Sequence, residues 1–369
     1  MTASAAVLAE QIRTRLAGYE RHFQGVFEEY FERLDATFDA PAFSRFAPEC
    51  LGLLREQSLR GGKRMRVALL HEAARLVTAE PVAGLDEAAV SIELFQTHAL
   101  VHDDIIDDSP TRRGGPTTYY AYRDRLPGHP QAALGLALLA GDLALALSQQ
   151  VLLDSKAAPA VRLAMLEVQV RAASATFVGQ IADMERDFTA LPDEDVLHDV
   201  ADYKSARYSV LAPLELGLLA AGAQPAAFAG ELRRYARLVG ISEQMRDDHQ
   251  DLFGDATAMG KPTGTDLRDG RRSYTVRALL AAELTVAERS LVESALGDRA
   301  CTAETVAAVR EIAYRRGVER KLRSDMRRHA ELASAEAARW RPRWREESVA
   351  FFAHMPLWSI DRLPAADGS

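Results

Sequence analysis

Apolar residues recur at spacings of three and four along most of this 369-residue chain, and this periodicity constrains its fold more than any other feature. Two stretches show it plainly, "AVLAEQIRTRLAGYERHFQGVFEEYFERL" and "AALGLALLAGDLALALSQQVLL". The alternation of apolar and polar residues that half-buried strands require is hard to find. The sequence therefore predicts an all-α protein, a helical bundle.

Segments rich in Gly, Pro and Asp, such as "SPTRRGGPT" and "GAQP", separate the predicted helices. The helices are expected over residues 3–35, 42–57, 64–78, 85–107, 131–153, 159–187, 194–221, 226–253, 273–296, 302–333 and 335–353. No connection is long or polar enough for an obvious linker, and no short-period repeat appears. We therefore expect a single domain over residues 1–369.

Composition excludes several classes of protein. A net charge of -8 argues against non-specific binding to nucleic acid, which requires a basic surface. The two cysteines, Cys50 and Cys301, offer neither a disulfide framework nor paired metal ligands, which favours a cytoplasmic location. Charged residues interrupt the apolar N-terminal stretch, so neither an export signal nor stable insertion into a membrane is expected.

Aspartates gather at the end of the predicted helix 85–107, in "LVHDDIIDDSPTRRGG". Asp103 and Asp107 are one helical turn apart, and Asp104 lies beside them. Like charges at this spacing weaken a helix, so local stability does not explain them. Later in the chain, "EQMRDDHQDLFGD" repeats the pattern with Asp247, Asp248 and Asp251. This second copy favours a cation site over a solvated surface.

Carboxylates without His or Cys partners suit Mg²⁺, which prefers oxygen ligands and often bridges the phosphates of a substrate. Cations accompany each acidic cluster. They are Arg112 and Arg113 after the first, Lys261 after the second, and Lys63, Arg64 and Arg66 in the early loop "RGGKRMR". Such groups bind phosphate oxygens that aspartates alone would repel. The sequence thus predicts magnesium that holds a diphosphate.

These segments resemble the trans-isoprenyl diphosphate synthases, or polyprenyl synthetases, over nearly the whole chain. The matching pieces occur in the family's order: "GGKRMR", "ELFQTHALVHDDIIDDSPTRRGG", "GDLAL", "GQIADME", "YKSARY", "EQMRDDHQDLFGD" and "GKPTGTDLRDGRRS". The resemblance implies the isoprenoid synthase fold, with a central apolar cavity between two aspartate-rich motifs. It also implies a homodimer.

The resemblance assigns roles to individual residues. Three Mg²⁺ ions and the allylic diphosphate would be held by Asp103, Asp104, Asp107, Asp247, Asp248 and Asp251, with Arg112, Lys204, Ser205, Gln244 and Lys261 around them. Isopentenyl diphosphate would bind at Lys63, Arg66, Gln96 and Arg113, where Gly62 lets the backbone approach the phosphate. Gln180 and Asp183 would be polar positions facing the cavity.

The implied reaction is ionisation of the allylic diphosphate, condensation with isopentenyl diphosphate, and elimination of a proton. Magnesium and cationic side chains stabilise the charge on the departing diphosphate. Apolar helix faces would shield the carbocation from water. The chain lacks a Gly-x-Ser-x-Gly turn, a catalytic cysteine context and a GxxxxGK[ST] loop, and this reaction requires none of them.

Residues upstream of the first acidic motif bear on product length. In the family these positions form the floor of the cavity, and here they are Ala99, His98 and Phe95. Ala99 leaves room, whereas His98 and Phe95 are bulky enough to close a tunnel after modest extension. The expected product is geranylgeranyl diphosphate, within a range from farnesyl to geranylfarnesyl diphosphate.

Some residues depart from the family's pattern or have a plainer interpretation. Glu243 replaces the usual aromatic residue before Gln244, where it either faces solvent or perturbs the allylic pocket. For His98 and His102, packing or a hydrogen bond behind the metal ligands is favoured over metal ligation. Trp340 and Trp344 are expected to pack within an Arg-rich, solvated terminal helix, and a transient membrane contact is the alternative.

Two alternative functions stay open at this stage. A class I terpene cyclase would share the helices, the magnesium and the first motif, but such cyclases usually carry an Asn/Ser/Glu triad where this chain has "DDHQD". A non-catalytic partner subunit of a heteromeric synthase commonly loses one acidic motif, and this chain keeps both. Condensation of isopentenyl diphosphate is therefore the favoured function.

Overall fold

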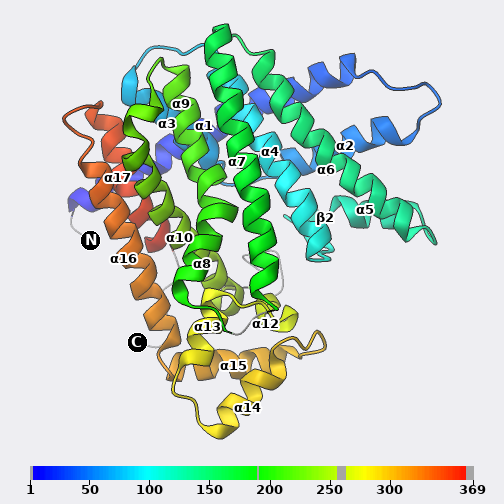
Figure 1. Cartoon of the computed structure of the whole chain (residues 1–369), viewed down its shortest axis with the longest axis vertical. Coiled ribbons are helices and arrows are strands. Elements are labelled where there is room, and N and C mark those ends of the chain that lie inside the picture. Colours follow the sequence, from blue (N-terminus) through cyan, green and yellow to red (C-terminus); the bar gives the residue numbers. More distant parts are fainter. Residues whose placement is uncertain (1–2, 189–190, 256–262, 363–369) are drawn as a thin grey trace. The chain divides into compact units, whose positions relative to one another are not determined.

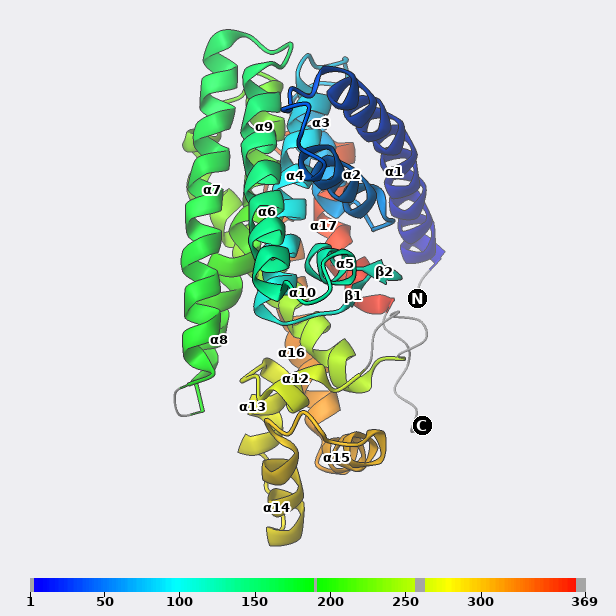
Figure 2. The same cartoon turned by 90° about the vertical axis from the view of Figure 1, so that its right-hand side faces the viewer.

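Helices make up most of the computed structural model, as the periodicity predicts (Figures 1 and 2). The structure describes residues 3–188, 191–255 and 263–362. Within these residues the only sheet is an antiparallel pair of two-residue strands, β1 (Thr111–Arg112) and β2 (Gly115–Pro116). The prediction of an all-α protein is confirmed.

The chain divides into two compact units, Met1–Ala173 with Ala212–Ala227 and Ser174–Leu211 with Phe228–Ser369. The single domain expected from the sequence stays a prediction. The first unit contains β1, β2 and the start of a helix that ends in the second unit, α7 (Pro159–Arg186). Its other helices are α1 (Ala3–Thr37), α2 (Phe46–Leu59), α3 (Met65–Val77), α4 (Leu85–Ile106), α5 (Thr118–Arg125), α6 (Pro130–Leu153) and α9 (Ala212–Ala220).

Two long helices, α4 and α6, run side by side in the first unit (Figures 1 and 2). Small residues on α6 permit this packing, because Ala133, Ala137, Ala140 and Ala144 are all fully buried. Among the described helices α6 alone is long and apolar enough to cross a membrane, judged by length and composition. Its packing in the first unit accounts for much of that apolar character, as in the core helices of soluble proteins.

The second unit contains the rest of α7 and most of the C-terminal half of the chain. Its other elements are α8 (Glu194–Ala201), the π-helix η1 (Asp202–Leu211), α10 (Ala229–Phe253), α12 (Thr265–Asp269), α13 (Tyr274–Ala281), α14 (Val286–Ala295), α15 (Ala303–Arg315), α16 (Val318–Ala338) and α17 (Glu346–Asp361). Apolar residues of α10, α13, α15 and α16 share one core. The short 3₁₀ turn η2 (Pro225–Phe228) precedes α10.

Three of the predicted helices are divided or displaced in the structure. The helix predicted over 273–296 is two helices, because Thr285 and Glu288 form a capping box that starts α14. The helix predicted over 302–333 breaks at Gly317, which adopts a left-handed conformation with φ of 70° before α16. The last helix lies at 346–361 instead of 335–353, and Trp340 is buried before it begins.

The predicted helix 194–221 changes geometry along its length. Its middle is η1, a π-helix of ten residues that holds the "YKSARY" segment. Such segments are rare and often occur at functional sites. The π-helix packs closely on α10 because Gly240 has no side chain: a Cβ atom there would lie 2.3 Å from the Cβ of Ala206.

This close approach makes Gly240→Ala a test of the packing between η1 and α10. We expect the substitution to lower the free energy of unfolding by about 1–3 kcal/mol, because the two helices must move apart. Gly135→Ala is the control, since a Cβ atom at Gly135 meets nothing within 4 Å and should be neutral or stabilising. Urea denaturation followed by circular dichroism measures both. A Gly240→Ala protein as stable as wild type would contradict the packing.

Candidate active site

The first acidic cluster lies where α4 ends. Asp107 caps the helix, and its backbone N–H donates to the Asp103 carbonyl oxygen at 2.8 Å. The next residue, Asp108, has a φ of 50°, and the chain turns there toward β1. Asp104 is buried, whereas Asp103 and Asp107 are half-buried. The last turn of α4 therefore presents three carboxylates in a confined space.

Arg112 on β1 partly balances this charge. Its Nε donates to Asp104 Oδ1 at 2.6 Å, and its Nη2 lies 3.5 Å from Asp103 Oδ2. Burial nevertheless raises the pKa of Asp104 to about 7, against the effect of Arg112 and together with that of Asp103 and Asp107. The other carboxylate oxygen, Asp104 Oδ2, is buried without a hydrogen-bond partner among the described residues. A divalent cation would satisfy both the charge and this oxygen.

Cations of the early loop lie close to the hairpin that carries Arg112. The Arg113 guanidinium packs on Gly62, where a Cβ atom would lie 3.1 Å from Arg113 Cζ. Burial lowers the pKa of Arg113, and Arg64 and Arg66 act in the same direction against the opposing effect of Glu93. Such crowding of positive charge favours an anionic ligand. Lys63 is exposed, and Gln96 is buried on α4.

Arg64 has an internal role instead of the phosphate-binding role that its place in the loop suggests. Its side chain is buried, pairs with the buried Glu93, and donates to the Ser58 carbonyl oxygen at 2.7 Å. The guanidinium also lies over the rings of Phe23 and Phe27, at 5.5 and 5.6 Å from their centroids. Arg64 therefore joins α1, α2 and α4, whereas its loop neighbours lie nearer the surface.

Upstream of the first cluster, aromatic rings line the side of α4 that meets α6. The ring of Phe95 lies 5.7 Å from that of His98, which lies 4.5 Å from that of His102. Phe95 and His98 are buried, and Ala99 beside them is half-buried. All three predicted floor positions thus lie on α4 within two turns of Asp103.

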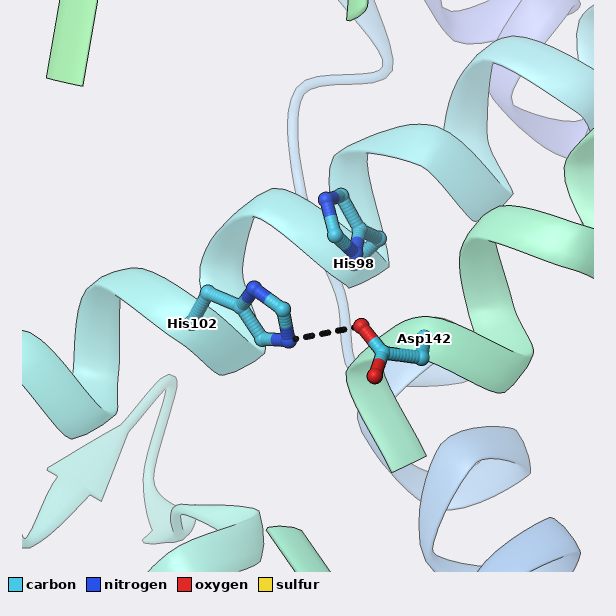
Figure 3. Close-up of side chains that lie close together, drawn as sticks. All are labelled: His98, His102 and Asp142. Atoms are coloured by element: carbon cyan, nitrogen blue, oxygen red, sulfur yellow. Dashed lines mark ion pairs between the residues drawn. The ribbon is translucent and has the colours of Figure 1, made fainter. Parts of the chain in front are cut away.

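His98, His102 and Asp142 come together between α4 and α6 (Figure 3). One ligand atom from each lies within 4.8 Å of the others, a spacing that a metal ion can bridge. However, His98 Nδ1 lies 2.9 Å from the Gly141 carbonyl oxygen, and His102 Nε2 lies 3.3 Å from that of Leu138. A carbonyl only accepts, so these nitrogens carry the protons. This geometry favours the packing role expected for both histidines.

The second acidic cluster lies near the end of α10, and its three aspartates differ in their hydrogen bonds and exposure. Asp248 accepts from Gln244 Nε2 and from the Tyr274 backbone N–H, both at 2.8 Å. Asp251 accepts from the Asp266 backbone N–H at 3.0 Å and from the hydroxyl and backbone of Thr265. Burial raises the pKa of Asp248 to about 6. Asp247 is the exposed member, with 61% of its side chain accessible.

Three residues of the second unit that were predicted from two separate segments form one hydrogen-bonded chain. Ser205 on η1 donates to Gln244 Oε1 at 3.3 Å, and the same Gln244 amide holds Asp248. The neighbouring Lys204 pairs with Asp183 of α7 at 2.7 Å. Arg186 also lies 3.0 Å from Asp183, and both cations lower the pKa of this buried carboxyl against the effect of burial.

Some predicted residues and one unpredicted group complete the description. Lys261 lies outside the described residues. Gln180 is half-buried on α7.

Sequence reasoning missed Arg246 and Ser359, which contact Glu243 beside the second cluster. The departure at Glu243 was the available signal, because an unexpected carboxylate near a buried motif requires a partner.

Comparison with known proteins gives consistent results. The model of the polyprenyl synthetase family matches residues 48–313. The farnesyl diphosphate synthase of Geobacillus stearothermophilus is 33% identical over 230 residues, which are 60% of this chain and 72% of that protein. The short chain isoprenyl diphosphate synthase of Methanothermobacter thermautotrophicus is 29% identical over 286 residues, which are 76% and 82% of the two chains.

A solved structure matches almost the whole chain. It is the geranylgeranyl pyrophosphate synthase from Corynebacterium glutamicum, complexed with isoprenyl diphosphate and magnesium. The two chains are 26% identical, with a TM-score of 0.80 over 96% of this chain and 99% of that one. The likeness therefore extends beyond the segment that the family model matches.

Proposed function

This chain belongs to the polyprenyl synthetase family and is a trans-prenyltransferase, and from that premise we propose how its residues divide the work. The family's substrates are isopentenyl diphosphate and an allylic diphosphate. The observation that carries the assignment is the end of α4. There Asp104 is buried with a raised pKa and an unsatisfied oxygen, between two other carboxylates and Arg112.

The residues of both acidic clusters fit Mg²⁺, because they offer hard oxygen ligands and are crowded enough to need a cation. Asp103, Asp104, Asp107, Asp247, Asp248 and Asp251 would hold three ions, as the family resemblance implies. Magnesium bound there would neutralise charge that develops on the departing diphosphate. Since Asp251 also anchors the start of α12 through Thr265 and Asp266, it is the ligand most tied to local structure.

The cationic side chains would bind the two diphosphates at separate positions. Arg112, Lys204 and Lys261, with Ser205 and Gln244, would line the allylic site. Lys63, Arg66, Gln96 and Arg113 would bind isopentenyl diphosphate, and Gly62 makes room for the guanidinium of Arg113. Arginine suits this task because its donors pair with two phosphate oxygens at once.

The reaction requires that the two substrates are oriented and that water is excluded, more than it requires a protein nucleophile. The allylic C–O bond breaks, and the electron pair leaves with the diphosphate. The alkene of isopentenyl diphosphate forms the new C–C bond to the allylic carbon, and the departed diphosphate takes the proton whose loss restores a double bond. Buried apolar residues such as Phe95 would exclude water from the allylic carbocation.

Condensation is expected to depend on the metal. Purified protein, labelled isopentenyl diphosphate and an allylic primer should give a longer prenyl diphosphate only with Mg²⁺, and excess EDTA should abolish the reaction. Asp104→Asn should lower kcat/KM by about a hundredfold or more, because it removes a ligand of the Mg²⁺ that would neutralise the departing diphosphate. Asp108→Asn is the matched control, since Asp108 is exposed and pairs with Tyr120.

No incorporation with five-, ten- or fifteen-carbon primers would contradict the proposed condensation. Formation of a cyclic hydrocarbon from the primer alone would instead indicate a cyclase. Activity that appears only after another prenyltransferase is added would indicate a partner subunit.

We further propose geranylgeranyl diphosphate as the product. Support comes from the buried rings of Phe95 and His98, which lie 5.7 Å apart one to two turns before Asp103, where they can stop a growing chain. The small Ala99 would not stop a shorter chain. The printed names of similar proteins include both farnesyl and geranylgeranyl synthases, so the length is argued from these three side chains.

Product length is therefore expected to increase in Phe95→Ala and His98→Ala, and most in the double variant, because each substitution removes a ring from the end of the path. Chromatography of the dephosphorylated products measures the length. Leu94→Ala is the control: it removes a fully buried side chain from the same helix, and adjacent positions point in different directions. An unchanged product in all three Phe95 and His98 variants would exclude this floor.

We also propose a homodimer. Two long helices present exposed apolar side chains, with Leu139 of α6 63% and Leu163 of α7 58% accessible, and a second copy of the chain would cover them. Light scattering should give twice the chain mass of 40.5 kDa. Leu139→Glu combined with Leu163→Glu should shift the mass toward a monomer, whereas Phe43→Glu, at a 91% exposed position, should not. A monomeric wild type would contradict this proposal.

A further inference from the structure

The exposed carboxylate of the second acidic cluster has a cation beside it. Both oxygens of Asp248 and both of Asp251 accept hydrogen bonds from the protein. Asp247 is 61% exposed, and Arg246 Nη2 lies 3.1 Å from its Oδ1. A guanidinium at this distance competes with a metal ion for the carboxylate. Whatever holds Arg246 therefore affects how well Asp247 can bind a cation.

Arg246 is held from the opposite side by a closed set of contacts. Its Nη1 lies 2.5 Å from Glu243 Oε2 and donates to the Ser359 hydroxyl at 2.5 Å. Ser359 in turn donates to the other oxygen of Glu243 at 2.5 Å. The three residues form a ring that joins α10 to α17, and the side chain of Arg246 is 10% exposed within it.

The charges in this group are arranged so that one negative charge remains. Glu243 and Asp247 are acidic, and Arg246 is the cation between them. An arginine guanidinium keeps its proton in proteins, and here carboxylates contact it from two sides. The guanidinium therefore stays charged and always needs a carboxylate. If Glu243 were neutral, Asp247 would be left to balance Arg246.

The position of Ser359, the second residue that holds Arg246, is fixed by the packing of α17. Tyr235 on α10 donates to the Phe352 carbonyl oxygen at 3.0 Å, and its ring lies 5.1 Å from that of Trp340 and 5.8 Å from that of Phe352. All three rings are fully buried. These contacts set the position of α17 along α10, so that Ser359 meets Glu243 and Arg246 about three turns farther along α10.

We propose that Glu243 and Ser359 are positioning residues that balance and hold Arg246, so that the Asp247 carboxylate stays available to Mg²⁺. The C-terminal helix thereby takes part in the metal site without contacting the metal. This inference rests on the proposed function, because it takes Asp247 as a ligand. It also explains the departure from the family's pattern at Glu243. The Glu243 carboxylate does not face solvent freely, because it contacts Arg246 and Ser359.

Titration of Mg²⁺ into the full-length protein with inorganic diphosphate, followed by calorimetry, tests the proposal without catalysis. Glu243→Gln should weaken Mg²⁺ binding about tenfold, the usual effect of removing a group behind a metal ligand. Ser359→Ala, which keeps both charges, should weaken it in the same direction but less. The Mg²⁺ concentration for half-maximal turnover should increase in the same order.

The decisive variant is Glu243→Gln combined with Arg246→Gln. With no guanidinium to balance, Asp247 is released, and Mg²⁺ affinity should return to within about threefold of wild type. Glu231→Gln is the matched control, because Glu231 is on the same helix and pairs with Arg343 at 3.0 Å, away from the cluster. Its Mg²⁺ affinity should equal that of wild type.

Two results would overturn the proposal. One is wild-type Mg²⁺ affinity in Glu243→Gln, even if its melting temperature falls, since that would show a purely structural role. The other is a double variant that binds as weakly as Glu243→Gln. If Glu243→Gln does not fold, Ser359→Ala decides, and unchanged binding in it counts against the proposal. A wild type without prenyltransferase activity would contradict the proposed function instead, and the calorimetric comparison would still stand.

Discussion

Crowded carboxylates at the ends of two helices are the constraint on which the rest of this structure depends. Near its end, each of α4 and α10 carries three aspartates where like charges repel, and burial raises the pKa of Asp104 and Asp248. The chain offsets this locally through Arg112 on the first cluster, and through Gln244 and backbone N–H groups on the second. Divalent ions would supply the remaining compensation, and their positive charge would attract a diphosphate.

The helical nature of the fold follows from the sequence, but the points where one helix ends and the next begins do not. Periodicity of apolar residues identifies α6 and α10 to within a few residues, because each buries one stripe, and α4 is identified by a long run of residues that is buried on all sides. The same periodicity runs across Gly317 and the capping box at Thr285, where local backbone geometry ends one helix and starts another. The sequence pattern also did not indicate the π-helix η1, because an extra residue per turn changes neither the composition nor the apolar pattern noticeably.

The candidate site was predictable where residue type determines chemistry. Aspartates spaced one turn apart and arginines in the following loop indicate sites for a metal and a phosphate, and the network of Ser205, Gln244 and Asp248 joins residues assigned from two segments. Sequence spacing could not distinguish Arg64, buried against Glu93, from its loop neighbours. It also could not pair Glu243 with Ser359, because that contact depends on how α17 packs on α10.

We propose that each acidic cluster binds metal ions when a diphosphate is present. Electron paramagnetic resonance of Mn²⁺, titrated into the full-length protein with inorganic diphosphate, measures the number of bound ions directly. We expect about three ions per chain in wild type, and fewer in both Asp103→Asn and Asp247→Asn, since a ligand is lost from either cluster. A full set of ions in one of these variants, with loss only in the other, would contradict it.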